Sequence, residues 1–251
     1  MASGAEQILL GGAGLLAGLT GSAGGITSLI TYPVLLGVGI APLPANVTQA
    51  VAFAACLPGS AAGSRPELRG QGGRIGRWGC VAVVAGLGGV ALLLDTPQHL
   101  FGLVVPYLLA LAAAALLLQP RITWWQDQHP GRNSARLFPL GLVAVSVYSG
   151  YFGAGSGVMI LALLLLTVER SLPRANALKN VVLGLADAVA AVAFALFGPV
   201  RWWAAWPLAL GLLAGSTLGP SITRRVPQGP LRVGVALVGL GLAVRLWIAP
   251  V

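Results

Sequence analysis

The sequence contains few charged residues: only 8% of its 251 residues are Asp, Glu, Lys or Arg. A soluble domain carries about 25% charged residues, which it needs to cover its water-facing surface. The chain therefore lacks the composition of a soluble globular protein. Its hydrophobic fraction of 57% and its mean hydropathy of +0.86 indicate that its solvent is lipid.

Cysteine and histidine are also scarce. Cys56 and Cys80 are isolated in apolar runs, and His99 and His129 stand in expected loops. These residues form no spacing typical of a metal site, so no metal or other cofactor is expected. No expected span contains a carboxylate pair, or a nucleophile with its base, which argues against an intramembrane enzyme.

Basic residues exceed acidic ones and give a net charge of +9, and Lys179 is the only lysine. The arginines stand in short segments between apolar runs, where an excess of positive charge on the cytoplasmic side of a membrane explains them. The sequence has no surface segment that combines aromatic and basic residues, so no nucleic-acid partner is expected. The expected partners are the lipid bilayer and a small solute, and the expected location is the bacterial inner membrane, as a multi-pass protein. A homo-oligomer is compatible with this composition.

What the sequence does contain is a series of long apolar runs. A transmembrane helix needs about 20 predominantly apolar residues, and the chain offers about eight such segments. These segments predict an all-α polytopic membrane protein. They lie near 7–40, 46–63, 73–94, 98–119, 138–167, 175–197, 202–222 and 231–248.

A glycine-rich motif occurs twice. Gly18–Gly25 (GLTGSAGG) aligns with Gly150–Gly157 (GYFGAGSG), and Ala45-Asn46 has a counterpart in Ala175-Asn176. Three apolar segments follow in each half, an organisation common in secondary transporters. The sequence therefore predicts two homologous four-segment repeats, at residues 1–119 and 138–251, joined by a basic polar linker at 120–137.

The first segment of each repeat, 7–40 or 138–167, is longer than one span and has its glycine motif near the middle. Each is either a broken helix that crosses the membrane once or a re-entrant helix pair. With two re-entrant pairs the repeats become inverted, and nearly all loop arginines collect on one side. We therefore favour the inverted arrangement, which also occurs in transporters with discontinuous helices.

Glycine-rich turns inside a membrane can bind anions. Glycine permits a positive φ, so that consecutive N–H groups converge, and the helix that follows begins with unpaired N–H donors and a partial positive charge. Two such turns facing each other predict an anion site, although close helix packing is an alternative role for the glycines. The substrate-binding residues predicted in the turns are Gly21, Ser22, Gly24, Gly25, Gly153, Gly155, Ser156 and Gly157.

Polar residues also stand in the apolar segment that follows each turn. The substrate-binding residues predicted there are Asn46, Thr48, Gln49, Asn176, Lys179 and Asn180. Ionic side chains inside a membrane are costly and usually functional. Lys179 would add a positive charge to the anion site, and Asp187 would act as its countercharge or as a proton acceptor for coupling. The alternatives are that Lys179 extends to the membrane surface and that the neutral residues form helix contacts.

The glycine turns, Pro33, Ala45-Asn46-Val47-Thr48, and Ala175 with Lys179-Asn180 resemble the TauE/SafE family of membrane permeases over nearly the whole chain. That family is associated with transport, often export, of sulfite, small organosulfonates or other sulfur compounds. The resemblance implies a duplicated multi-helix fold. It points to Gly21, Gly24, Gly25, Gly153, Gly155, Gly157, Thr48 and Lys179 as functional positions. One position departs from the pattern, because Leu178 stands where Thr or Ser is common.

These observations predict a secondary transporter, rather than an enzyme, for small anions such as sulfite or organosulfonates across the inner membrane. Export is the expected direction. An anion channel and a non-transporting membrane assembly protein are the alternatives. Transport by a carrier saturates as the substrate concentration rises, whereas flux through a channel does not. The sequence does not distinguish these two cases.

Overall fold

The computed structural model describes residues 3–24, 26–128, 137–169, 171–223 and 228–248. Over these ranges every regular element is a helix, which confirms the expected all-α class. The described helices are α1 (Gly4–Gly24), α2 (Thr27–Gly37), α3 (Pro42–Phe53), α4 (Cys56–Gly63), α5 (Arg65–Leu68), α6 (Gly72–Leu94), α7 (Gln98–Gln128), α8 (Phe138–Tyr151), α9 (Ser156–Thr167), α10 (Leu172–Phe197), α11 (Trp202–Thr223) and α12 (Gln228–Ile248).

Within the described ranges, three helical segments are long and apolar enough to cross a membrane. They are Gly72–Leu94, Gln98–Leu118 and Leu172–Phe197. Many large apolar side chains on the outer surface are exposed, among them Leu196 and Phe197, as expected of a surface that faces lipid. These three segments coincide with three of the eight that the sequence predicts.

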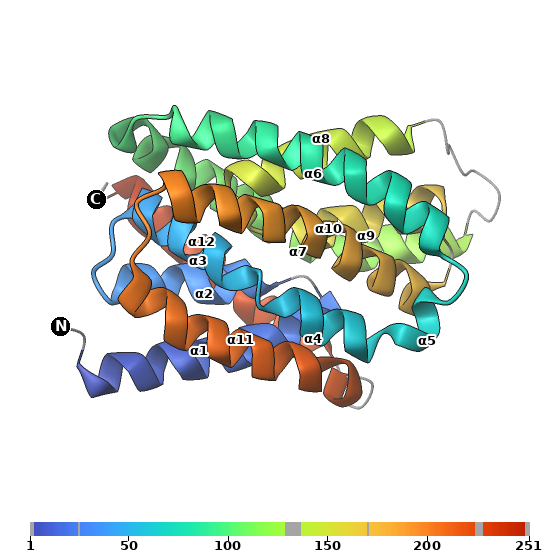
Figure 1. Cartoon of the computed structure of the whole chain (residues 1–251), viewed down its shortest axis with the longest axis horizontal. Helices are drawn as coiled ribbons and strands as arrows, with labels where there is room; N and C mark the ends of the chain where they lie inside the picture. The colour runs from blue at the N-terminus through green and yellow to red at the C-terminus, as the bar shows by residue number, and fades with distance from the viewer. Residues whose placement is uncertain (1–2, 25, 129–136, 170, 224–227, 249–251) are drawn as a thin grey trace.

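The two long apolar runs each form a pair of helices. The first pair is α1 and α2, which pack against each other, and Figure 1 shows α2 returning along α1. The second pair is α8 and α9. Gly141, near the start of α8, faces the side chain of Leu163 in the second half of α9, so the two helices are antiparallel. Both glycine motifs therefore lie where one helix ends and the next begins.

The expected segment 46–63 is interrupted. It consists of α3 and α4, separated at Ala54–Ala55. Pro58 has no N–H to donate to the carbonyl of Ala54, and its ring crowds that carbonyl. Around the break, the backbone N–H groups of Ala54, Ala55 and Leu57 bond to carbonyls three residues earlier. This tighter turn bends the segment next to α10.

Glycines bring two pairs of helices from opposite halves of the chain into close contact. Gly14 and Gly18 of α1 face the backbone of α11, and Gly89 of α6 faces the backbone of α8 around Gly150. In Figure 1, α1 and α11 form one edge of the molecule, α6 and α8 the opposite edge, and α3, α4 and α10 lie between them. Small residues allow such close approach of helices in membranes.

The end of the first half is more helical than expected. The sequence predicts a polar linker from residue 120, but α7 continues through Pro120 to Gln128. Residues 129–136, the most basic part of the expected linker, lie outside the described residues.

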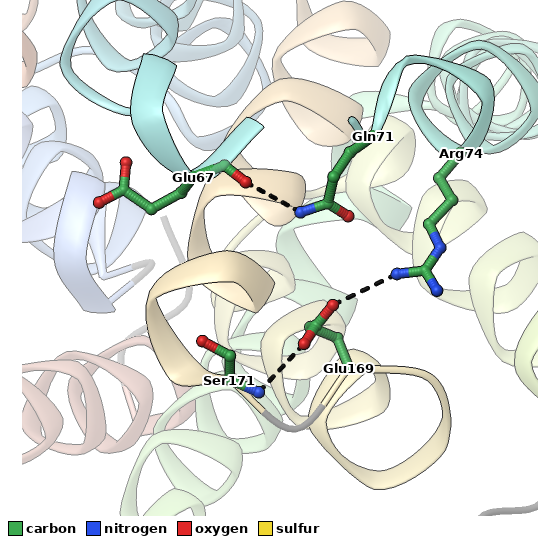
Figure 2. A network of polar contacts seen from close by, with 5 residues as sticks. All are labelled: Glu67, Gln71, Arg74, Glu169 and Ser171. Carbon is green, nitrogen blue, oxygen red and sulfur yellow. Dashed lines mark hydrogen bonds and ion pairs between the residues drawn. The ribbon is translucent and has the colours of Figure 1, made fainter. Parts of the chain in front are cut away.

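An ion pair connects the start of α6 to the segment between α9 and α10. Arg74 Nη1 lies 3.2 Å from Glu169 Oε2, and the backbone N–H of Ser171 donates to Glu169 Oε1 at 3.2 Å (Figure 2). The Arg74 guanidinium also lies 5.7 Å from the ring centroid of Trp78. Nearby, Gln71 Nε2 donates to the carbonyl of Glu67 at 3.0 Å. This polar cluster fixes the end of the bundle at which α10 begins.

Candidate functional site

A cavity of about 100 Å³ lies among α3, α4, α10 and the turns of both helix pairs. A single water molecule needs a cavity of at least about 10–15 Å³, so this cavity has room for several waters or for a solute of a few heavy atoms. Its lining residues are Gly21, Thr27, Ser28, Gln49, Ala50, Phe53, Cys56, Leu57, Ser60, Ser149, Phe152, Gly153, Ser156, Gly157, Lys179, Asn180, Leu183, Gly184, Asp187, Ala190, Phe194 and Ser216.

One face of α10 forms a long wall of the cavity. Lys179, Leu183, Asp187, Ala190 and Phe194 all line it, and their spacing of three or four residues places them on one side of the helix. From the first to the last of them α10 rises about 22 Å, against a hydrocarbon core of about 30 Å. The lining therefore follows α10 over much of the thickness of a membrane.

The second turn depends on glycine geometry. Gly153 and Gly155 have φ values of +78° and +74°, which glycine adopts without steric cost. Ser156 Oγ donates to the carbonyl of Gly153 at 2.9 Å, and Tyr148 Oη donates to the carbonyl of Ala154 at 2.6 Å. These bonds hold the turn in one shape and place Gly153 and Ser156 at the cavity.

The two turns meet. Ser28 Oγ, in the first turn of α2, donates to the carbonyl of Gly153 at 3.4 Å. The rings of Tyr32 and Phe152 pack edge to face, with centroids 5.4 Å apart. Gly21 is required at its position, because a Cβ there would collide with Thr27. The cavity is thus bordered by both helix pairs at the point where they touch.

Lys179 is buried at the cavity wall, with 2% of its surface exposed. Its Nζ donates to the carbonyl of Gly21 at 3.3 Å. That carbonyl is one of the last four of α1, which have no partner within their own helix and carry partial negative charge. Lys179 therefore extends to the end of another helix inside the protein.

Asp187 lines the same cavity eight residues further along α10. Its carboxylate makes no hydrogen bond or ion pair with any residue that the structure describes. The thiol of Cys56 and the hydroxyl of Ser216 line the same cavity. One cationic and one anionic side chain thus share the cavity without pairing.

A chain of side-chain hydrogen bonds runs from α2 through α3 to the second turn. Thr31 Oγ1 donates to Gln49 Oε1 at 2.8 Å, and Gln49 Nε2 donates to Asn46 Oδ1 at 3.1 Å. Asn46 Nδ2 then donates to the carbonyl of Tyr151, the last residue of α8, at 3.0 Å. Gln49 lines the cavity, whereas Asn46 is buried behind it.

The model of the sulfite exporter TauE/SafE family matches residues 8–246. The chain belongs to this family. The match includes both glycine turns, α10 and every residue that lines the cavity. No curated protein and no solved structure gives a significant match. The chain is thus a multi-pass member of a family of membrane transporters for sulfite or related anions, as the resemblance in its motifs implies.

The structure of this TauE/SafE protein brings eight of the predicted site residues to the cavity: Gly21, Gln49, Gly153, Ser156, Gly157, Lys179, Asn180 and Asp187. Asn46, Thr48, Gly155 and Asn176 do not line it. Thr48 Oγ1 instead accepts a hydrogen bond from the N–H of Arg201, where α11 begins. Gly25 lies outside the described residues, and for Ser22 and Gly24 only their place in α1 is described.

Five hydroxyl groups at the cavity of this TauE/SafE protein are not among the predicted site residues. They belong to Thr27, Ser28, Ser60, Ser149 and Ser216. Ser60 and Ser216 each follow a glycine, and Gly59 packs directly against Ser216. A small polar residue beside a glycine in an apolar run is the signal in the sequence, but many such pairs occur in a chain with 36 glycines. Among the described residues, no cluster of His, Cys, Asp and Glu can hold a metal ion.

Proposed function

We propose that this protein is a secondary transporter that exports sulfite or a related small oxyanion across the bacterial inner membrane through the cavity beside α10. The observation that supports this most is the position of Lys179. The only lysine of the chain is buried at the cavity wall, at a depth where an ionic group is costly unless it serves a function.

The groups around Lys179 suit an oxyanion. An ammonium group has three donors, and one of them is directed to Gly21. The two remaining donors, together with the hydroxyl of Thr27, supply hydrogen bonds for an oxyanion in a small space. The hydroxyls of Ser28 and Ser156 already donate to the carbonyl of Gly153. Hydrogen bonds between a charged donor and an anion are about twice as strong as neutral ones. Apolar residues such as Phe53 and Phe194 complete the lining, as in most small-molecule sites.

We also propose that residues 1–119 and 138–251 form inverted repeats joined by the segment 120–137. The contacts between the halves support two matching repeats, because α1 packs on α11 and α8 packs on α6. When the two helices of each pair are counted separately, the first helix of each half contacts the fourth apolar segment of the other half. The first helices are α1 and α8, and the fourth segments are α6 and α11. The capping bonds are reciprocal in the same way: Lys179 bonds the end of α1, and Asn46 bonds the end of α8.

The experiment is exchange of sulfite in proteoliposomes. The purified protein is reconstituted with unlabelled sulfite inside, and entry of ³⁵S-labelled sulfite is followed against protein-free liposomes. A carrier gives saturable entry that internal sulfite accelerates. Entry that is linear in concentration and insensitive to internal sulfite would identify a channel. Absence of protein-dependent entry for sulfite and for methanesulfonate would overturn the proposed function.

A further inference from the structure

The Asp187 carboxylate is the one acidic group at the cavity, and nothing in the described structure neutralises it. It lines the cavity but makes no hydrogen bond or ion pair with a described residue. Lys179, on the same helix, lies eight residues away, which is about 12 Å along the axis. The Lys179 ammonium is instead directed to the carbonyl of Gly21. Asp187 is therefore available for a ligand of its own.

The charged and titratable groups around Asp187 are few. Among the helices that pack on α10, α1, α3, α8 and α9 contribute only uncharged residues to the lining, and α4 contributes the thiol of Cys56. α5 and α6 contribute no residue to the lining. From α11 comes the hydroxyl of Ser216. Apart from Asp187 itself, the titratable groups at the cavity are Lys179 and Cys56.

An ionised Asp187 and a bound anion disfavour each other. At a separation of about 10 Å inside a protein, the repulsion between two negative charges weakens binding on the order of tenfold. A cation on Asp187 removes this repulsion. Because linkage is reciprocal, the anion then also increases the affinity of Asp187 for that cation. Resting on the transport proposed above, we infer that Asp187 binds a proton that crosses the membrane together with the anion. A sulfite dianion accompanied by a proton keeps a single net negative charge, which an inside-negative membrane potential drives outward.

A proton fits the surroundings of Asp187 better than a metal cation does. Hard cations need several oxygen ligands, whereas Asp187 is the only carboxylate in the cavity lining, and no group of His, Cys, Asp and Glu among the described residues can hold a metal ion. A proton needs only one carboxylate oxygen. An O–H bond forms on Asp187 with a proton from water on one side of the membrane. It breaks on the other side, where the proton returns to water and the carboxylate is restored.

The test uses the full chain in sodium-free proteoliposomes with an interior more alkaline than the exterior. The imposed pH gradient should drive ³⁵S-sulfite above its external concentration in the wild type, after subtraction of entry into protein-free liposomes. Asp187→Asn cannot release a proton. The amount of sulfite that this variant accumulates should fall about tenfold or more. The variant should still exchange labelled for unlabelled sulfite when the pH is equal on both sides. Asp187→Glu should restore accumulation. Asp95→Asn, in the exposed link between α6 and α7, is the matched control and should accumulate sulfite like the wild type.

The outcomes separate this inference from the proposed function. If the wild type does not exchange sulfite, the proposed function fails. If it exchanges sulfite but a pH gradient drives no accumulation, or if Asp187→Asn accumulates as well as the wild type, proton coupling at Asp187 is wrong and the transport function stands. If Asp187→Asn also loses exchange, the result for Asp187→Glu decides between the two possibilities. Accumulation of sulfite by Asp187→Glu supports the inference, and absence of that accumulation overturns it.

Discussion

Lys179 Nζ and the carbonyl oxygen of Gly21 lie 3.3 Å apart, although 158 residues separate them in the chain. The contact joins the second half of the protein to the end of α1, next to the first glycine turn. Asn46 makes the corresponding contact in the other direction, to the carbonyl of Tyr151 at the end of α8. Each half thus supplies a side chain that caps the helix before the other half's turn.

Replacement of Lys179 tests the anion site. Lys179→Met removes a charged donor, so the half-saturating concentration of sulfite in the exchange assay should rise about tenfold to a hundredfold, equivalent to about 1.5–3 kcal/mol. Lys179→Arg keeps the charge and should lose less. Arg174→Met, which removes an exposed cation from the same helix, is the control and should leave the value unchanged. An unaltered half-saturating concentration in Lys179→Met would remove Lys179 from the site.

Replacement of Asn46 separates a structural role from a binding role. Asn46→Ala leaves the carbonyl of Tyr151 and the amide of Gln49 without their partners, and buried unpaired groups cost about 1–3 kcal/mol each. The variant should unfold in detergent at a temperature lower by several degrees. Once folded, it should bind sulfite with nearly the affinity of the wild type. A wild-type melting temperature with a large loss of affinity would instead place Asn46 in contact with the substrate.

Gly155 should tolerate no side chain. Its φ is +74°, and an added Cβ would lie 3.0 Å from the Cα and Cβ of Ala112 in α7. Gly155→Ala should therefore destabilise the protein by about 1–3 kcal/mol, measured as a fall in melting temperature. Gly73→Ala serves as the control, because no atom lies within 4 Å of the added methyl group. Equal stability of the two variants would contradict the described turn.

Gly18 should be needed for packing and not for binding. A Cβ at this position would lie 2.8 Å from the backbone nitrogen of Ser216 in α11. Gly18→Ala should separate α1 from α11 and lower the free energy of unfolding by about 1–3 kcal/mol. Gly12→Ala, on the same helix but facing open space, should be neutral or slightly stabilising. Thermal unfolding of the two variants side by side measures the difference.

The sequence was sufficient to predict the all-α class and the helix breaks at the two glycine motifs, because apolar runs and glycine clusters are local signals. It did not predict the break between α3 and α4. It did not show which glycine serves which purpose. Gly18 and Gly21 are three residues apart in one motif, yet Gly18 faces α11 and Gly21 lines the cavity. That difference depends on the helices packed around them, which no local pattern records.

The same limit applies to the polar residues of the spans. Asn46 and Gln49 both qualify as ligands by type and depth, but only Gln49 reaches the cavity. The side-chain amide of Asn46 instead donates a hydrogen bond to the carbonyl of Tyr151, which is 105 residues away in the chain. Ser60 and Ser216 reach the cavity because two glycine-containing helices approach closely, and Gly59 faces Ser216. Contacts between distant segments decided the site in each case.

The interruption between α3 and α4 makes two walls of the cavity differ in regularity, because one wall is a continuous helix and the other is a broken one. The wall formed by α10 is an unbroken helix of 26 residues. Opposite it, the ladder of backbone bonds changes its spacing at Ala54–Ala55, beside Phe53 and Cys56 of the lining. A continuous helix and an interrupted one thus line the same cavity. If the width of the cavity changes, we expect the bend to occur at Ala54–Ala55, while Lys179 and Asp187 keep their spacing on the continuous helix α10.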